Sequence, residues 1–272
     1  MSMPNELVLL RHGESEGNVA SRLAKTGDLS SYTDSFVTTP GHRWRLTSRG
    51  REQAHTVGGW IRRELPAFDR HMVSPYVRAK ETAAELDLSD VRWLLSRAVR
   101  ERDWGDIGSM PRQRFEGDYP QNARMRRTDP LYWVPPGGES IAHVAEDRVR
   151  NALATLHREC SGQRVLMVTH GELMLAFRLV LERWSDEEFL DHSEAAQEKI
   201  TNCTVLHYSR TNPTKGDVMP TLGFLRSARP VEINGSWQVQ VSDWQSLPSA
   251  EMTNDDLRAS FARADSREND DT

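Results

Sequence analysis

The sequence predicts an α/β fold, a three-layer αβα sandwich with a mostly parallel central sheet. Two apolar runs, 7–10 and 165–168, are continuous, as in strands that are buried on both faces of a parallel sheet. A histidine followed by a glycine closes each run, as His12-Gly13 and as His170-Gly171. Segments with helical periodicity lie between the runs, and strands that alternate with helices are typical of layered α/β domains.

Three further segments are strand candidates, and the first of them is shorter. They are 72–73, 205–208 and 221–225. The segment 231–241 alternates around Asn234-Gly235, a dipeptide that favours the tight turn of a β-hairpin, so a hairpin is predicted there.

Four segments have apolar residues at the spacings of three and four that indicate helices. They are 47–65, a segment that starts after Pro75, 140–160 and 173–184. Thr47 and Ser48 are candidate N-caps of the first helix, and Gly162 ends the third.

Two stretches without periodicity, about 25–45 and 106–138, are expected to be insertions in a single domain that covers 1–248. From Ser249 the chain becomes polar and ends in a run of acidic residues. The segment 249–272 is therefore expected to be a disordered C-terminal tail.

The composition is that of a globular protein. Of 272 residues, 37% are hydrophobic and 28% are charged, and the net charge is −5. This charge argues against non-specific binding to nucleic acids or anionic membranes, so neither is expected as a partner.

Cysteine usage favours a reduced setting. Cys160 and Cys203 provide neither a disulfide framework nor zinc-site spacing, so the cytoplasm is the expected location. The apolar run 7–10 is too short for a signal peptide or a membrane span.

The two His-Gly endings indicate a binding site. Ligands of parallel sheets bind at the carboxyl ends of the strands, and a glycine lets the backbone approach a ligand closely. Each ending alone would be read as an ordinary strand cap. Two of them, one preceded by Arg11, favour a site that contains His12 and His170.

Six segments then resemble one family in the expected order, from about residue 5 to residue 210. They are Arg11 to Ser15 with Asn18, 46–54, 74–83, 100–105, 136–140 and 168–172. Together they are similar to the histidine phosphatase superfamily, the phosphoglycerate mutase-like proteins. The resemblance implies the same αβα fold and identifies 1–248 as the catalytic domain.

The resemblance also implies the chemistry. His12 would receive the phosphoryl group, Arg11, Arg78 and His170 would bind its oxygens, and Glu101 would supply the proton. Arginine forks match two phosphoryl oxygens at once. These groups replace a metal, so no cofactor is expected. A zinc site from His12, His170 and Glu101 is conceivable from residue types alone, but the two arginines would repel a dication.

Further substrate-binding candidates are Ser15, Asn18, Gly171, Arg126 and Arg127. Four of them have an alternative structural role. Ser15 could instead be a helix N-cap, Asn18 a helix-end residue, and the basic pair a solvated surface.

Three functions remain open. We favour a phosphatase for small phosphorylated substrates, because 137–140, Gly-Gly-Glu-Ser, is more typical of the phosphatase branch. A phosphoglycerate mutase-type phosphoryl transfer is the alternative, since Arg126-Arg127 is similar to the mutases. A catalytically inactive binding module is the second alternative, although all five core residues are present. The sequence leaves the substrate and the oligomeric state open.

Overall fold

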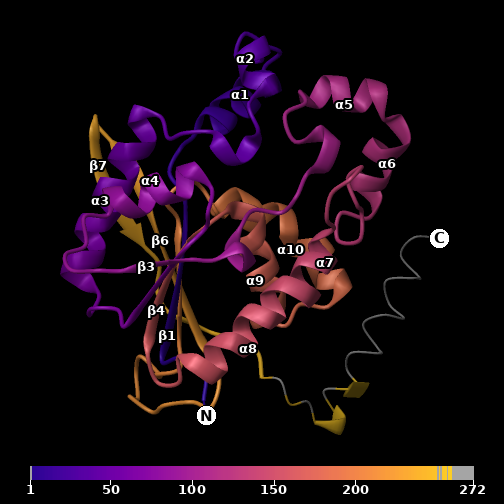
Figure 1. Ribbon diagram of the computed structural model, residues 1–272. Helices are drawn as coiled ribbons and strands as arrows, with labels where there is room; N and C mark the ends of the chain where they lie inside the picture. Colours follow the sequence, from indigo (N-terminus) through magenta and orange to yellow (C-terminus); the bar gives the residue numbers. More distant parts are fainter. Residues whose placement is uncertain (1, 250, 252, 256, 259–272) are drawn as a thin grey trace.

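A single mixed sheet forms the centre of the computed structural model, which describes residues 2–249, 251, 253–255, 257 and 258 (Figure 1). Within these residues the sheet has eight strands, in the order β3-β2-β4-β1-β5-β6-β7, with β8 paired to β6. The strands are β1 Glu6–Arg11, β2 Arg70–Val73, β3 Trp93–Leu95, β4 Arg164–Thr169, β5 Val205–Ser209, β6 Phe224–Ile233, β7 Ser236–Val241 and β8 Gln245–Ser246.

One half of the sheet is parallel and carries the candidate site. β3, β2, β4 and β1 are parallel neighbours, whereas β5, β6 and β7 continue the sheet by antiparallel pairing. Arg11 at the end of β1 is opposite Thr169 at the end of β4. The residues that follow these two strands therefore leave the sheet side by side.

Helices cover both faces of the sheet. They are α1 Glu16–Lys25, α2 Asp34–Thr38, α3 Ser48–Glu64, α4 Val77–Glu85, α5 Arg112–Asp118, α6 Pro120–Thr128, α7 Ile141–His143, the π-helical turn η4 Val144–Val149, α8 Arg150–Glu159, α9 Gly171–Leu181 and α10 Asp186–Lys199. Single-turn 3-10 helices are η1 Gly41–Arg43, η2 Arg97–Val99 and η3 Gly105–Ile107.

Two apolar clusters confirm the three layers. Alternate residues of β1 point to opposite faces. Leu7 and Leu9 pack in one cluster with η4, α8 and α9, and Val8 and Leu10 pack in the other with α3 and α4. The α/β class and the αβα sandwich predicted from the sequence are thus confirmed. The central sheet is largely parallel with antiparallel strands on one side.

Most predicted elements are present, with shifted limits. The strand expected at 221–225 begins only at Phe224, and the hairpin turns at Asn234 and Gly235, both with positive φ. The helix expected at 140–160 is one continuous run in which η4 inserts a wider turn. Ser140 accepts a hydrogen bond from the His143 N–H at its start, at 3.0 Å.

The predicted insertions are not bare loops. The first contains α2 and η1, and the second contains η3, α5 and α6. Figure 1 shows α2, α5 and α6 at the end of the molecule opposite the N-terminus. Both insertions thus lie toward the sheet edge at which β1 and β4 end.

Other expectations are met in part. Cys160 and Cys203 are free and buried. Among the described residues, no helix is long and apolar enough to cross a membrane. Most of the expected tail, residues 250, 252, 256 and 259–272, lies outside the described residues, so the division at residue 248 stays a prediction.

Candidate active site

Two histidine rings are in contact at the end of the parallel strands. His12 follows β1 and His170 follows β4, and their ring centroids are 5.1 Å apart at 61°. The side chains are nearly inaccessible, with 2% and 0% exposure. The expectation that one phosphoryl group could touch both rings agrees with this spacing.

The hydrogen bonds of His12 define its tautomer. Nδ1 lies 2.7 Å from the Gly13 carbonyl oxygen, which can only accept, so Nδ1 carries the proton. Nε2 therefore carries no proton, and its lone pair accepts a hydrogen bond from Arg78 Nε at 3.0 Å. Burial, together with the charges of Arg78 and Arg11, holds the pKa of His12 well below its usual value of 6.5.

Two arginines surround this nitrogen with positive charge. Arg78 is buried, donates to the Gly41 carbonyl oxygen at 2.7 Å, and has its pKa lowered to about 10 by burial. Arg11 donates to the Ile200 carbonyl oxygen at 2.6 Å, and burial lowers its pKa. Among the described residues, Arg11 Nε has no hydrogen-bond partner. A buried donor of this kind fits an anion.

His170 has one ring nitrogen satisfied. Nε2 is 2.7 Å from Ser74 Oγ, while Nδ1 has no partner within the described part of the chain. The ring also contacts Tyr76 at 5.0 Å between centroids. Burial and the Arg78 charge hold the pKa of His170 well below 6.5. A neutral His170 still offers one N–H, and its role as a donor to the phosphoryl group stays a prediction.

Glu101 is a carboxyl group with an environment suited to holding a proton. Its Oε1 accepts from the Arg102 N–H at 3.1 Å and from the Leu173 N–H at 3.3 Å. Burial and the nearby charge of Glu172 raise the pKa of Glu101, against the opposing charge of Arg78.

Close backbone packing shapes the loop after His12. Gly13 lies against Gly50 of α3, where a Cβ on either residue would overlap a backbone oxygen. The Gly13 N–H donates to Thr82 Oγ1 at 3.0 Å. The predicted residue Gly171 is less constrained, because a Cβ there would meet the Arg11 side chain first, at 3.3 Å.

Ser15 and Asn18 face each other beside this loop. Asn18 Oδ1 accepts from the Ser15 N–H at 3.1 Å and from Ser15 Oγ at 3.0 Å. Asn18 also accepts from Asn202 Nδ2 at 3.0 Å, which in turn lies 3.2 Å from the His12 carbonyl oxygen. Asn202 was missed, because it is 190 residues from His12 in sequence and lies in no recognisable motif.

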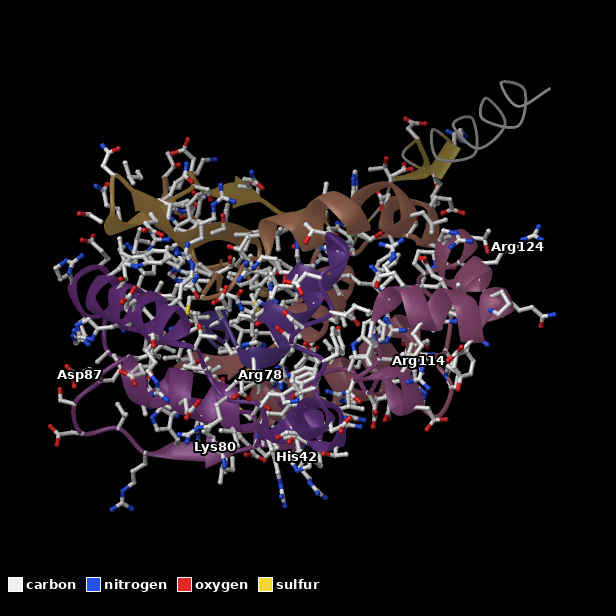
Figure 2. All side chains as sticks on the ribbon, turned by 90° about the horizontal axis from the view of Figure 1, so that it is seen from above. His42, Arg78, Lys80, Asp87, Arg114 and Arg124 are labelled. Atoms are coloured by element: carbon white, nitrogen blue, oxygen red, sulfur yellow. The ribbon has the colours of Figure 1, made fainter. Side chains whose placement is uncertain are left out.

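The two adjacent arginines of the second insertion, Arg126 and Arg127, lie in different surroundings. Arg126 is half-buried, and its guanidinium lies 4.9 Å from the Trp104 ring and 5.6 Å from the Trp133 ring. Arg127 is exposed and lies 4.0 Å from Glu116. Figure 2 shows Arg124 of the same helix at the periphery, whereas Arg78 is enclosed by other side chains.

Within the part of the chain that the structure describes, no group of three or more His, Cys, Asp or Glu side chains is arranged to hold a metal ion. Metal-independent chemistry stays a prediction that rests on the charges of the arginines.

The αβα fold and the two histidines in contact are the features expected of the histidine phosphatase superfamily. Comparison with known proteins identifies the same family. The chain belongs to branch 1 of the histidine phosphatase superfamily, whose family model matches residues 7–215.

Its curated relatives include mutases. It is 33% identical over 200 residues to a 2,3-bisphosphoglycerate-dependent phosphoglycerate mutase of Methylobacterium radiotolerans, covering 70% of this chain and 84% of the relative. It is 30% identical to a phosphoglycerate mutase-like protein of Arabidopsis thaliana, covering 69% of this chain and 60% of the relative.

Its structural neighbours include phosphatases. An α-ribazole phosphatase from Shigella flexneri matches with a TM-score of 0.58 at 22% identity, covering 80% of this chain and 96% of that chain. A mycobacterial glucosyl-3-phosphoglycerate phosphatase matches with a TM-score of 0.57 at 23% identity, covering 80% and 99%. At these identities, the likeness shows the shared fold.

Proposed function

We propose that this protein hydrolyses small phosphomonoesters through a phosphohistidine on His12, without a metal. The observation that carries the proposal is the state of His12. Its Nε2 is unprotonated, its ring is oriented by the Gly13 carbonyl, and Arg11, Arg78 and His170 surround it with donors. Phosphoryl transfer requires an uncharged nucleophile and positively charged groups that bind the phosphoryl oxygens.

The reaction has two steps. In the first, His12 Nε2 forms a bond to phosphorus, the bond to the leaving oxygen breaks, and Glu101 gives that oxygen a proton. In the second, water attacks phosphorus, Glu101 takes back a proton, and the bond between nitrogen and phosphorus breaks to release phosphate. Arg78 Nε, which donates to Nε2 here, would donate to a phosphoryl oxygen once substrate is bound.

Charge balance supports a phosphatase over a mutase. A mutase must hold a second anionic group, which needs additional unneutralised cations. Arg100 and Arg148 both pair with Glu139, at 3.0 and 2.7 Å, and Arg102 pairs with Glu172 at 3.1 Å. Because Glu139 balances only one of its two arginines, these five side chains keep a single positive charge, which is less than a second phosphate and a carboxylate would require.

Mutase-type transfer is the second candidate. The curated relatives with this name favour it. Arg126 favours it as well, because this half-buried cation comes from the second insertion and lies 4.9 Å from the ring of Trp104, three residues after Glu101.

One set of assays decides between these functions. We expect phosphate release from a panel of sugar phosphates, phosphoglycerates and nucleotides, undiminished by EDTA. Loss of turnover in EDTA that zinc or magnesium restores would refute metal independence. Faster interconversion of 2- and 3-phosphoglycerate, dependent on added 2,3-bisphosphoglycerate, would identify a mutase. A binding module would release no phosphate and would lose nothing on His12→Ala substitution.

A further inference from the structure

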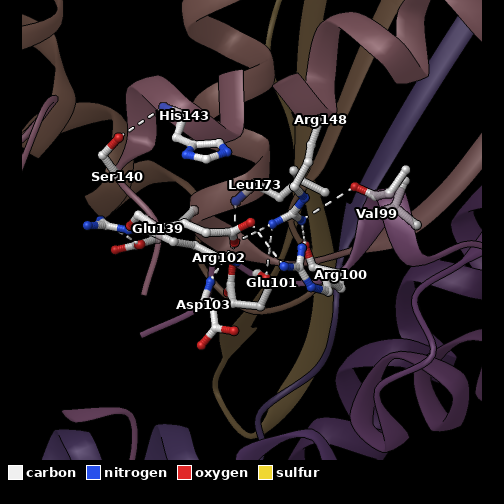
Figure 3. A network of polar contacts seen from close by, with 12 residues as sticks. Val99, Arg100, Glu101, Arg102, Asp103, Glu139, Ser140, His143, Arg148 and Leu173 are labelled. Carbon is white, nitrogen blue, oxygen red and sulfur yellow. Dashed lines mark hydrogen bonds and ion pairs between the residues drawn. The ribbon is translucent and has the colours of Figure 1, made fainter. Parts of the chain in front are cut away.

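Glu139 occupies the centre of a polar network next to the candidate acid (Figure 3). It lies just before the helix that begins at α7, and its side chain is only 14% exposed. Oε1 accepts from Arg100 at 3.0 Å, and Oε2 accepts from Arg148 at 2.7 Å and from the Asp103 N–H at 2.9 Å. Both oxygens of the carboxylate are thus used by the segment around Glu101 or by Arg148.

The backbone of Glu139 holds the same segment. Its N–H donates to the Asp103 carbonyl oxygen at 2.9 Å, and its carbonyl oxygen accepts from Arg102 Nε at 2.6 Å. Glu139 therefore forms hydrogen bonds with residues on both sides of Glu101. Although burial acts to raise the pKa of Glu139, the Asp103 hydrogen bond and the two arginines lower it, so the group is a carboxylate.

Arg148 reaches the segment from the opposite side. Its side chain is 9% exposed and comes from η4, the π-helical turn. Single π-helical turns are often found at functional positions. Arg148 donates to the carbonyl oxygens of Ala98 and Glu101, each at 3.4 Å, and also to that of Arg100. Because one buried guanidinium binds three carbonyl oxygens between residues 98 and 101, the backbone of this segment has little freedom to move.

The side chain of Glu101 is held far less firmly than its backbone. Among the described residues, its side chain accepts hydrogen bonds from the Arg102 and Leu173 N–H groups, both at a single oxygen, Oε1. The direction in which the carboxyl group points is therefore set mainly by where the backbone places Cα. Because proton transfer requires an approach of about 2.6–3.2 Å, a small backbone shift would disable it.

We infer that Glu139, acting with Arg148, is a positioning residue that aims Glu101 at the leaving oxygen. The inference rests on the proposed function, in which Glu101 is the acid. Glu139→Gln keeps the shape but removes the charge, and its amide NH₂ would face the N–H donors of Arg148, Arg100 or Asp103. The segment around Glu101 would then become more mobile, and the Glu101 carboxyl group would no longer be oriented toward the leaving oxygen. His12, Arg11 and Arg78 would keep their positions.

A double-mutant cycle with two substrates tests this inference. Single-turnover phosphorylation of the protein is measured with p-nitrophenyl phosphate, a good leaving group, and with glycerol 3-phosphate, a poor one. We expect Glu139→Gln to slow the poor substrate by about 10–10²-fold, a part of the 10²–10⁴-fold typical of general acid catalysis, and the good one by no more than about threefold. In a Glu101→Gln background, Glu139→Gln should add less than about threefold, because there is no acid left to aim.

The two failures are distinguishable. If Glu101→Gln itself shows no preference between leaving groups, the proposed acid is wrong. If Glu101→Gln shows the preference but Glu139→Gln slows both substrates equally, or multiplies fully with Glu101→Gln, the positioning role is wrong.

Two further variants guard against a folding defect. Glu146→Gln is the matched control, since it removes an exposed partner of Arg150 from the same helix, and it should leave both rates unchanged. Glu139→Asp retains the charge and should restore most of the loss with glycerol 3-phosphate. If Glu139→Gln does not fold, the smaller loss that remains in Glu139→Asp decides: a loss confined to the poor substrate supports the inference, and either no loss or an equal loss with both substrates contradicts it.

Discussion

At the scale of single residues, the site shifts the pKa values of His12 and Glu101 in opposite directions. Burial and two arginines keep the pKa of His12 low, so its Nε2 stays unprotonated as the pH falls through 6.5. Burial and Glu172 raise the pKa of Glu101, so its carboxyl group keeps a proton to a higher pH than an ordinary glutamate. A base and an acid can therefore be present together, which is the arrangement that general acid catalysis needs.

This separation predicts the pH dependence. With an alkyl phosphate, kcat/KM should not fall because of His12 as the pH drops through 6.5. It should decline as the pH rises through the raised pKa of Glu101, and Glu101→Gln should lose that decline. Ionisation of the substrate itself, near pH 6, is common to both proteins and provides the control. Identical alkaline limbs in the two proteins would contradict the role of Glu101.

At the scale of elements, the site depends on how closely α3 approaches the loop after β1. Gly50 and Gly13 pack backbone against backbone, and Gly50 also touches the backbone of Glu14. Gly50→Ala should therefore destabilise the fold by about 1–3 kcal/mol, as expected for overpacking. It should also reduce phosphorylation of His12, because the loop must move away from its position.

Gly117 offers the matched control. It lies in α5, where a Cβ would meet no atom within 4 Å. Gly117→Ala should stabilise the protein by about 0.5–1 kcal/mol, through lower backbone entropy in the unfolded chain. Urea denaturation of both variants checks the pair. A Gly50→Ala protein as stable as the parent would show that the close approach is not maintained in solution.

The elements also show what could be predicted from the sequence. Local signals were sufficient for β1, β4, α3 with its N-cap at Thr47, and the start of the long helix near Ser140, because apolar periodicity and capping depend on near neighbours. They were insufficient for α10, for the π-helical turn and for the short helices of the two insertions. Arg148 lies within the helix that the sequence predicts at 140–160, but no sequence signal marks its contacts. Its partners lie 9 to 50 residues away, and such contacts leave no local pattern.

At the scale of the molecule, the two insertions meet at the end of the sheet that carries the site. Ser109 Oγ lies 3.4 Å from the Val37 carbonyl oxygen, and Gln113 donates to the Ala24 carbonyl oxygen. Gly41 of the first insertion accepts from Arg78. The insertions therefore contact each other and one of the proposed phosphate-binding arginines, so our prediction remains that they shape substrate choice.

The predicted domain limit is tested by truncation after Ser249. The shortened chain keeps β8 and the Pro248 carbonyl oxygen that accepts from Arg183. Because the polar segment beyond can bury little apolar area, turnover should stay within about twofold of the full chain. A large drop in turnover would instead mean that the segment contributes to the site.

The central claim is that His12 carries the phosphoryl group during turnover. The most direct test is to quench the Glu101→Gln protein with isotope-labelled p-nitrophenyl phosphate and to examine the bound label. Glu101→Gln should slow hydrolysis of the intermediate, since it removes the base for water. We predict acid-labile, base-stable phosphate on Glu101→Gln, mapped to His12, and none on His12→Ala. Label that persists on His12→Ala, or that is stable in acid, would contradict the account.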